Sequence, residues 1–389
     1  MALTPGLGPR RIHRAVRGMR EAAELFRLPL TGLEALQIPA ASARFIAEGK
    51  ARQAAEEEWQ QICNSGCSLM VYADADYPER LREIFDPPPV LWVRGDRSLL
   101  SRPAIAVVGT RSPSPYGTGM AEMLARDLAA RRMVILSGMA RGVDTAAHKG
   151  ALTAGGRTIA VWGTGLDVIY PKENKRLAEE IILSGGAIVS EQPMGTFPAP
   201  QNFPLRNRII SGMSVGVLVV EAGEQSGTRV TARCALEQNR DVFAVPGNVT
   251  SRNAWGPNTL IKQGAKLVAT WEDIWEELPS QIRLELGGRP DLAAGAQDDL
   301  FASGSESEAG VTASLLRQGE SALPPGPSLS PPEAAVYGML RMDEALHIEE
   351  LLERLDGQVT SAEVFTALFE LELNNRIRQL PGKNYVRRI

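Results

Sequence analysis

Small, hydroxylated and basic residues follow a series of short apolar segments in this chain, and their chemistry is that of anion binding. In Gly109-Thr110-Arg111-Ser112 the glycine allows a ligand close to the backbone, and the hydroxyls can donate hydrogen bonds. The arginine can bind an oxyanion through two N–H groups. The segment is typical of a phosphate site. It matches neither GxGxxG nor the P-loop sequence, so it does not indicate a dinucleotide or ATP site.

Later segments have the same character. Gly163-Thr164-Gly165 again permits close backbone approach, and Lys172 stands just before a predicted helix at residues 175–183, whose N-terminal dipole favours an anion. Ser226-Gly227-Thr228 opens another helix. The densest cationic signal is Phe203-Pro204-Leu205-Arg206-Asn207-Arg208, in which the ring can stack on a base and the arginines can neutralise phosphates.

Two simpler explanations remain open for this last segment. Phe203 can be an ordinary core residue, and one of the arginines can form a buried pair with Glu191 or Glu221. A single small phosphate ligand needs only one anion site, however, whereas a polymer with many phosphates accounts for several. The recurring pattern therefore favours a polynucleotide ligand.

Asp144 and His148 stand one helical turn apart, a spacing that suggests acid–base catalysis or a metal site. No third ligand and no nucleophile accompanies them, so we favour a structural role in which Asp144 caps the helix that carries His148. The three cysteines form neither a disulfide framework nor a four-ligand zinc site. We expect no catalytic residue, no metal and no cofactor.

The elements that position these residues are short strands alternating with helices. Such a pattern predicts an α/β fold with a mostly parallel sheet covered on both faces, and ligands beyond the carboxyl ends of its strands. Strands are expected at residues 90–95, 104–111, 133–136, 158–162, 187–189, 215–222, 241–245 and 266–269, and later helices at 228–239, 258–264 and 271–278.

The length of 389 residues suggests two or three domains. Residues 1–72 are predicted to form a small helical domain and residues 77–280 the sheet domain. Residues 281–332 lack periodicity and predict a flexible linker. In residues 333–389, three helices followed by a hairpin predict a winged helix, with a recognition helix at 361–373. The exposed face of that helix is acidic, so protein contact is at least as good an interpretation as DNA reading; the acidic residues are Glu363, Glu370 and Glu372.

The N-terminal segment is strongly basic. Gly6-Leu7-Gly8-Pro9 forms a tight turn before a helix, and such a turn can place N–H groups and arginines against a phosphate backbone. An ordinary connection between helices explains it equally well. The cluster consists of Arg10, Arg11, Arg14, Arg17 and Arg20.

The overall composition excludes a membrane span, because no long uncharged apolar segment occurs. The same arginines interrupt any apolar signal core, and we expect a cytoplasmic protein. The formal net charge of −4 does not by itself indicate a nucleic-acid binder, so the distribution of charge matters more than the sum.

The central motifs resemble the DNA-processing protein A family (DprA, also called Smf). The resemblance covers roughly residues 77–278 and is carried by the order and spacing of its segments. These are Gly109-Thr110-Arg111, residues 137–144 (SGMARGVD), 163–171 (GTGLDVIYP), 203–210 (FPLRNRII), Ser226-Gly227-Thr228 and 244–247 (AVPG).

This resemblance implies an extended Rossmann fold, flanked by a sterile-alpha-motif-like or helix-hairpin-helix domain and a C-terminal winged helix. It implies a non-enzymatic protein that binds single-stranded DNA, protects incoming strands in natural transformation and loads the RecA recombinase. It also implies a homodimer through Asn258, Leu260 and Ile261. The implied DNA-binding residues are Gly109, Arg111, Ser112, Gly138, Lys172, Phe203, Arg206, Asn207 and Arg208.

Two other functions remain open. A nucleotide-hydrolysing Rossmann enzyme of the phosphoribohydrolase type also uses Gly-Thr helix starts, and it would need a catalytic glutamate, for which Glu221 is the candidate. Its segment 222–225 lacks the expected glycine pair. The chain can also be mainly a protein scaffold that acts through its C-terminal module.

Overall fold

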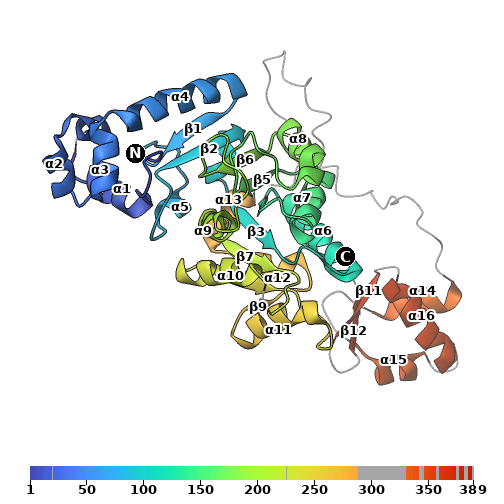
Figure 1. Cartoon of the computed structure of the whole chain (residues 1–389). Coiled ribbons are helices and arrows are strands. Elements are labelled where there is room, and N and C mark those ends of the chain that lie inside the picture. Colours follow the sequence, from blue (N-terminus) through green and yellow to red (C-terminus); the bar gives the residue numbers. More distant parts are fainter. Residues whose placement is uncertain are drawn as a thin grey trace, which may run out of the picture. The chain divides into compact units, whose positions relative to one another are not determined.

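The computed structural model describes residues 1–19, 21–224, 226–287, 330–340, 346–355, 359–373, 376–380 and 384–387. The chain divides into two compact units, Met1–Ala296 and Gln297–Ile389 (Figure 1). Each unit is described by itself. None of the described helices is long and apolar enough to cross a membrane.

A nine-stranded sheet forms the centre of the first unit, in the order β1-β2-β6-β5-β4-β3-β7-β8-β9. Strands β3 to β9 pair in parallel, whereas β1 and β2 add an antiparallel edge. The order reverses at β3, which lies between β4 and β7, and this reversal opens a crevice at the carboxyl ends. The strands are β1 (Ser68–Val71), β2 (Val90–Gly95), β3 (Ala104–Val108), β4 (Val134–Ser137), β5 (Thr158–Trp162), β6 (Ala187–Ser190), β7 (Gly216–Val219), β8 (Asp241–Ala244) and β9 (Lys266–Leu267).

Helices cover both faces of this sheet because successive strand residues point to opposite sides. On β3, Ala106 packs on the face covered by α5 (Glu79–Arg82), α9 (Asn202–Met213) and α10 (Thr228–Glu237). Its neighbour Ile105 packs on the other face. That face is covered by α6 (Pro115–Ala129), α7 (Val143–Thr153), α12 (Trp271–Glu277) and α13 (Ser280–Leu286). Helix α8 (Lys175–Leu183) packs near β5 and β6. Helix α11 (Trp255–Lys262) precedes β9 in the chain.

The N-terminal helices have a small apolar core of their own and also adjoin the sheet edge. Ile62 packs with Trp92 of β2, and the Trp92 indole donates to Glu58 Oε1 at 2.7 Å. The helices are α1 (Pro9–Val16), the 3₁₀ helix Ala22–Arg27, α2 (Leu30–Ala35), α3 (Ala40–Ala47) and α4 (Lys50–Ser65).

Two predicted boundaries are wrong. The helical region was expected to extend to residue 72, but β1 pairs with β2 and so belongs to the sheet. The linker was expected from residue 281, but α13 continues to Leu286, and Ile282 and Leu286 are buried in the sheet-domain core. Both errors arise because short segments gain their apolar partners only in the folded chain. Residues 288–329 of the predicted linker lie outside the described residues.

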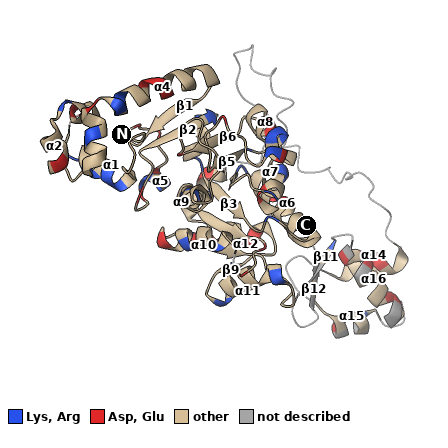
Figure 2. Ribbon diagram, viewed as in Figure 1, with Lys and Arg blue, Asp and Glu red and all other residues tan. Residues whose placement is uncertain are grey.

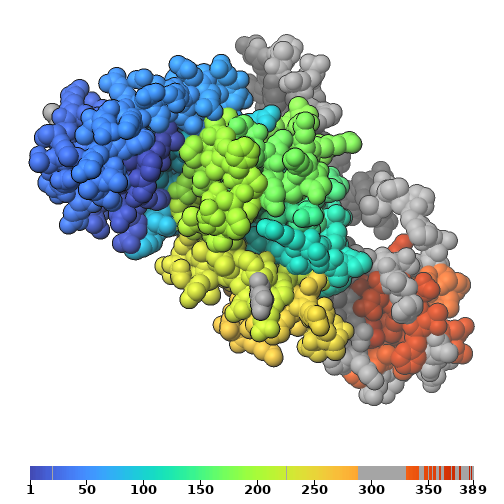
Figure 3. All heavy atoms as spheres, viewed as in Figure 1, coloured from blue at the N-terminus to red at the C-terminus, as the bar shows by residue number. Residues whose placement is uncertain are grey.

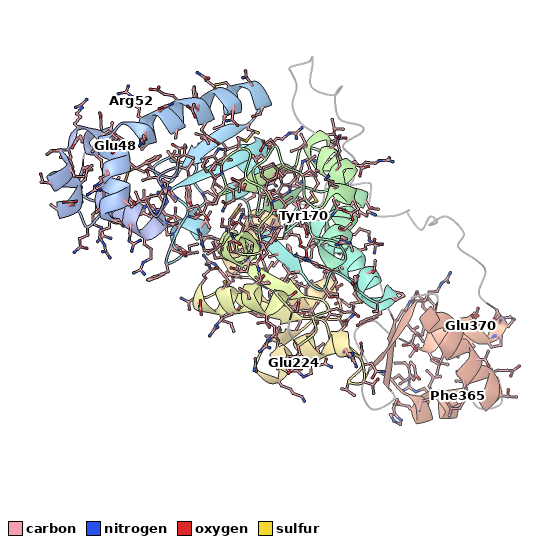
Figure 4. The ribbon with its side chains drawn as sticks, viewed as in Figure 1. Glu48, Arg52, Tyr170, Glu224, Phe365 and Glu370 are labelled. Atoms are coloured by element: carbon pink, nitrogen blue, oxygen red, sulfur yellow. The ribbon has the colours of Figure 1, made fainter. Side chains whose placement is uncertain are left out.

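The second unit has the predicted winged-helix arrangement. Its three-stranded sheet has the order β10-β12-β11, and its helices share one apolar core. On α16, Glu370 and the half-exposed Phe365 both lie on the surface (Figure 4). The elements are α14 (Pro331–Met339), β10 (Leu346–His347), α15 (Ile348–Arg354), α16 (Ser361–Leu373), β11 (Ile377–Leu380) and β12 (Asn384–Arg387).

Candidate nucleic-acid interface

A cleft of about 870 Å³ lies at the carboxyl ends of the strands, where the strand order reverses. It is formed by the loop after β3, the start of α9 and the start of α10. A much smaller hollow of about 20 Å³ adjoins it and includes Gly138 in its lining. Five of the nine predicted DNA-binding residues line the cleft itself: Gly109, Arg111, Phe203, Arg206 and Asn207.

Arg111 and two aromatic rings form one wall of this cleft. Arg111 is exposed, and its guanidinium carbon lies 5.8 Å from the centroid of the Phe203 ring. Phe203 is half-buried and packs against Tyr170, with ring centroids 5.4 Å apart and planes tilted by 37°. Figure 4 labels Tyr170 near the centre of the sheet domain. A cation beside partly exposed rings can hold a phosphate and stack a base at the same place.

Tyr170 is absent from the predicted site residues, although it lines both the cleft and the smaller hollow. An aromatic residue soon after the glycine-rich end of β5 is the signal that identifies it. Its position is fixed by the fold, since Phe203 comes from α9, more than thirty residues later in the chain.

Glycines bring the loops of the cleft close together. A Cβ on Gly109 would lie 2.6 Å from the Val143 side chain, at the start of α7. Gly142 has a φ of +77°, and a Cβ there would lie 2.4 Å from the Thr110 carbonyl. Side chains at these positions would separate the loop after β3 from α7, so the glycines set the floor of the cleft.

Arg206 is buried and helps to hold the floor of the cleft together. Only 8% of it is exposed, and its Nη1 donates to the carbonyls of Gly138, at 2.8 Å, and Val161. Burial lowers its pKa to about 10, an effect that the nearby Asp144 opposes. Its guanidinium therefore joins the loop after β4 to strand β5, and its predicted contact with a phosphate stays a prediction.

Asp144 also holds the loop after β4, through hydrogen bonds from the backbone of that loop. Its predicted role as the cap of α7 is wrong. Gly142 is the N-cap, and Asp144 Oδ2 accepts from the N–H groups of Gly138, at 3.1 Å, and Ala140, at 3.2 Å. Burial raises the pKa of Asp144 to about 6, with Arg206 acting in the opposite direction. The Asp144 carboxyl group therefore has a structural role in the loop after β4.

His148 is fully buried, and its hydrogen-bond partner is Thr158 of β5. Its Nδ1 lies 2.7 Å from Thr158 Oγ1, and the Thr158 hydroxyl donates to the Ile135 carbonyl, so Nδ1 is the donor to Thr158. Burial lowers the pKa of His148 to about 3, which keeps the ring neutral. Within the described ranges no group of His, Cys, Asp and Glu side chains is arranged to hold a metal ion.

Arg208 lies outside the cleft lining and pairs with acidic side chains, and its predicted role in DNA binding stays a prediction. Its Nη2 donates to Glu191 Oε1 at 2.6 Å, and its Nε lies 3.2 Å from Asp86 Oδ2. The Arg208 side chain is only 10% exposed. This is the buried pair with Glu191 that the sequence had left open as an alternative.

The remaining predicted residues flank the cleft. Lys172 is exposed and opens a 3₁₀ turn directly after Pro171, which lines the smaller hollow. Ser112 is also exposed, and its backbone carbonyl accepts from Asn253. Neither side chain lines the cleft. Arg111 and Lys172 thus lie at the carboxyl edge of the sheet, whereas Arg208 is directed toward Asp86 and Glu191.

Glu221, the candidate catalytic residue of the hydrolase alternative, has structural partners. Its carboxylate accepts from the Ser114 N–H at 2.8 Å and the Ser114 hydroxyl at 2.6 Å, and thereby fixes the start of α6. A Cβ on Gly117 would lie 2.5 Å from Glu221 Oε2. Glu221 borders a separate hollow of about 450 Å³ with Tyr116.

The residues predicted for dimerisation lie on α11, beside the edge strand β9. Asn258 exchanges two hydrogen bonds with the backbone of Gly247, and Leu260 is half-buried against the core. Ile261 is half-exposed. Asn258 therefore has a role within the chain, whereas Ile261 remains accessible.

Comparison with known proteins identifies the family. The model of DNA recombination-mediator protein A matches residues 68–279, and the DprA winged helix domain matches residues 320–383. Protein Smf of Escherichia coli (strain K12) is 42% identical over 331 residues, which cover 82% of this chain and 77% of that protein. The chain belongs to the DNA recombination-mediator protein A family.

Two further relatives agree with this assignment. DNA processing protein DprA of Bacillus subtilis (strain 168) is 45% identical over 56% of this chain and 73% of that protein. The X-ray structure of DNA processing protein A from Streptococcus pneumoniae has a TM-score of 0.63 and 36% identity, over 72% of this chain and 96% of that chain. The family resemblance of the sequence motifs and the predicted fold class are confirmed.

Proposed function

We propose that this protein binds single-stranded DNA in the cleft at the carboxyl edge of its sheet and does not cleave it. The observation that carries the proposal is the juxtaposition of exposed Arg111 with the Phe203–Tyr170 ring pair inside one large cleft. Arginine supplies phosphate binding, and the rings supply a face for an unstacked base.

A single strand suits this cleft better than a duplex. Bases of a single strand can turn outward onto aromatic rings, whereas duplex bases are already stacked on one another. Lys172, exposed at the rim, adds a second cation for the backbone.

Binding without catalysis is favoured by the hydrogen bonds that the buried carboxylates already accept within the protein. Asp144 accepts from two loop N–H groups, and Glu221 accepts from Ser114. Both carboxylates are thus used as structural acceptors, which leaves the hydrolase alternative without a free general base among the residues first considered for it.

The finer parts of the function belong to the same proposal. We propose that the protein protects incoming strands in natural transformation, loads RecA onto them and acts in the cytoplasm as a homodimer. The half-exposed Ile261 and the edge strand β9 support a dimer contact at α11. An Ile261→Asp variant should sediment as a monomer while a wild-type dimer persists. A wild-type monomer would contradict the dimer proposal alone.

The binding test compares labelled single- and double-stranded oligonucleotides at two salt concentrations. We expect preferential single-strand binding that weakens as salt rises, because bound phosphates release counterions. Release of ribose phosphate from nucleoside monophosphates by the purified protein, without oligonucleotide binding, would favour the hydrolase instead. Equal affinity for both DNA forms would contradict the stacking argument.

A further inference from the structure

The cleft does not use an arginine-rich face of α1. Arg10 and Arg14 are four residues apart on one face of α1, and Arg17 follows three residues later as the C-cap of the helix; all three are exposed. Ile12 and Ala15 point the other way and are buried in the N-terminal core. Figure 2 shows the basic residues on α1.

These arginines lack ionic partners among the residues that the structure describes. Arg14 donates to the neutral side chain of Gln37 at 2.8 Å, and Arg10 lies over the ring of Phe85. Other exposed arginines in the same unit do have carboxylate partners, such as Arg52 with Glu56 at 3.2 Å. The face of α1 therefore keeps its full positive charge toward solvent.

An exposed aromatic ring adjoins this face. Phe85 is 77% exposed, and the Arg10 guanidinium carbon lies 4.0 Å from its ring centroid. The backbone near this ring is tied to α1, because His13 Nε2 donates to the Pro87 carbonyl at 2.9 Å. The combination of cation and exposed ring repeats that of Arg111 and Phe203 in the cleft.

Helix α9 connects the two places. Phe203 and Asn207 of α9 line the cleft, while Arg208 of the same helix pairs with Asp86, the residue after Phe85. Leu205, also on α9, is 55% exposed. Helices α1, α5 and α9 follow one another in Figure 1, and the blue N-terminal helices and the yellow-green segment near residue 200 share one face in Figure 3.

We propose that the face formed by Arg10, Arg14, Arg17 and Phe85, here called the α1 surface, is a second contact for single-stranded DNA. The strand leaves the cleft, crosses the exposed side of α9 and reaches the α1 surface. There the arginines bind phosphates, and Phe85 offers its ring to a base. This proposal rests on the proposed function of the cleft and extends its footprint.

The test measures affinity and salt dependence with oligothymidylates of increasing length. The triple variant Arg10→Ala/Arg14→Ala/Arg17→Ala should bind short oligomers like the wild type. It should lose roughly tenfold or more in affinity for longer oligomers, with a salt slope lower by about 2, at about 0.7 for each lost phosphate contact. Phe85→Ala should weaken binding of the same long oligomers by roughly tenfold without changing the salt slope.

A matched control removes three exposed arginines that already have carboxylate partners: Arg52→Ala/Arg126→Ala/Arg233→Ala. Arg52 lies on the outer side of α4 (Figure 4). This variant should keep the wild-type salt slope at every length. Urea unfolding of both triple variants checks that each remains folded.

The outcomes separate this proposal from the function of the cleft. Three results would overturn the proposal for the α1 surface and leave the proposed function of the cleft intact. They are an unchanged affinity of the α1 variant for long oligomers, an equal loss of affinity for the shortest oligomers, and an equal loss of affinity in the control variant. A wild type that binds no oligonucleotide of any length would overturn the proposed function itself. Binding of an acidic protein at the α1 surface in place of DNA would also reject the proposal.

Discussion

Replacing Arg208 by alanine should destabilise the fold and leave the cleft chemistry intact. Arg208 Nη2 donates to Glu191, and the two side chains are only 10% and 17% exposed. The variant leaves the Glu191 carboxylate buried without its cation. This outcome differs from the one expected of a DNA-contacting arginine, so a single substitution separates the two roles.

The magnitude follows from the burial of the pair. Removing one partner of a buried ion pair costs about 3–5 kcal/mol, because the remaining charge stays desolvated. Asp86 is more exposed, at 34%, and its contact with Arg208 adds little because solvent screens it. Replacing both partners, as in Arg208→Met/Glu191→Leu, should recover most of this loss, since an apolar pair leaves no buried charge.

Equilibrium urea unfolding measures the stability of each variant, and anisotropy of a labelled single strand measures binding under conditions in which each is folded. We expect a lower urea midpoint for Arg208→Ala, an unchanged m value and a wild-type salt slope. If Arg208→Ala kept the wild-type midpoint but lost affinity, with a slope lower by about 0.7, Arg208 would be a phosphate contact and the ion-pair reasoning would be refuted.

Three further predictions concern the cleft and its floor. Arg111→Ala should weaken single-strand binding and lower the salt slope by about 0.7, whereas Phe203→Ala should cost about 1–3 kcal/mol of binding at an unchanged slope; identical behaviour of the two variants in a salt titration would contradict their assigned roles. Gly138→Ala places a Cβ 2.5 Å from Arg206 Nη2 and should reduce both the free energy of unfolding, by about 1–3 kcal/mol, and DNA affinity; a wild-type urea midpoint would show that Arg206 is not held there. Between about pH 4 and 6, the raised pKa of Asp144 keeps a proton on the folded state that the unfolded state has lost, which lowers the free energy of unfolding as pH rises. The lowered pKa of His148 leaves the unfolded state with the extra proton, which raises the free energy of unfolding as pH rises, so the two effects oppose each other. Asp144→Asn should therefore make the free energy of unfolding rise by about 1.4 kcal/mol per pH unit relative to the wild type over this range, and parallel pH profiles of the two proteins would contradict the burial of Asp144 as a titrating acid.

Much of the fold could be predicted from local patterns. Each predicted strand of the sheet domain is present, because β-branched residues in short runs bounded by glycine specify strands with little help from distant residues. Strand β1 and helix α13 were assigned to other regions. Both are short, and each depends on distant partners: β1 on β2, and α13 on the apolar face that includes Ile282.

The candidate site was predicted less evenly. Arg111 and Phe203 do meet in one cleft, because strand-end and helix-start residues of a parallel sheet gather at the same edge. Tyr170 was missed, since its contact with Phe203 joins the loop after β5 to the distant helix α9. Arg206 and Arg208 were both expected to bind phosphate, and neither is a free cation in the structure.

The sequence by itself determined the parallel sheet, the edge at which we propose that DNA binds and the family, because strand periodicity and strand-end residues are local properties. Only the tertiary structure decided which arginines remain free. Arg206 and Arg208 are two residues apart on α9 and so point about 200° apart, one toward the Gly138 loop and one toward Glu191. Their partners are distant in the chain, and burial beside those partners turns two identical side chains into structural supports.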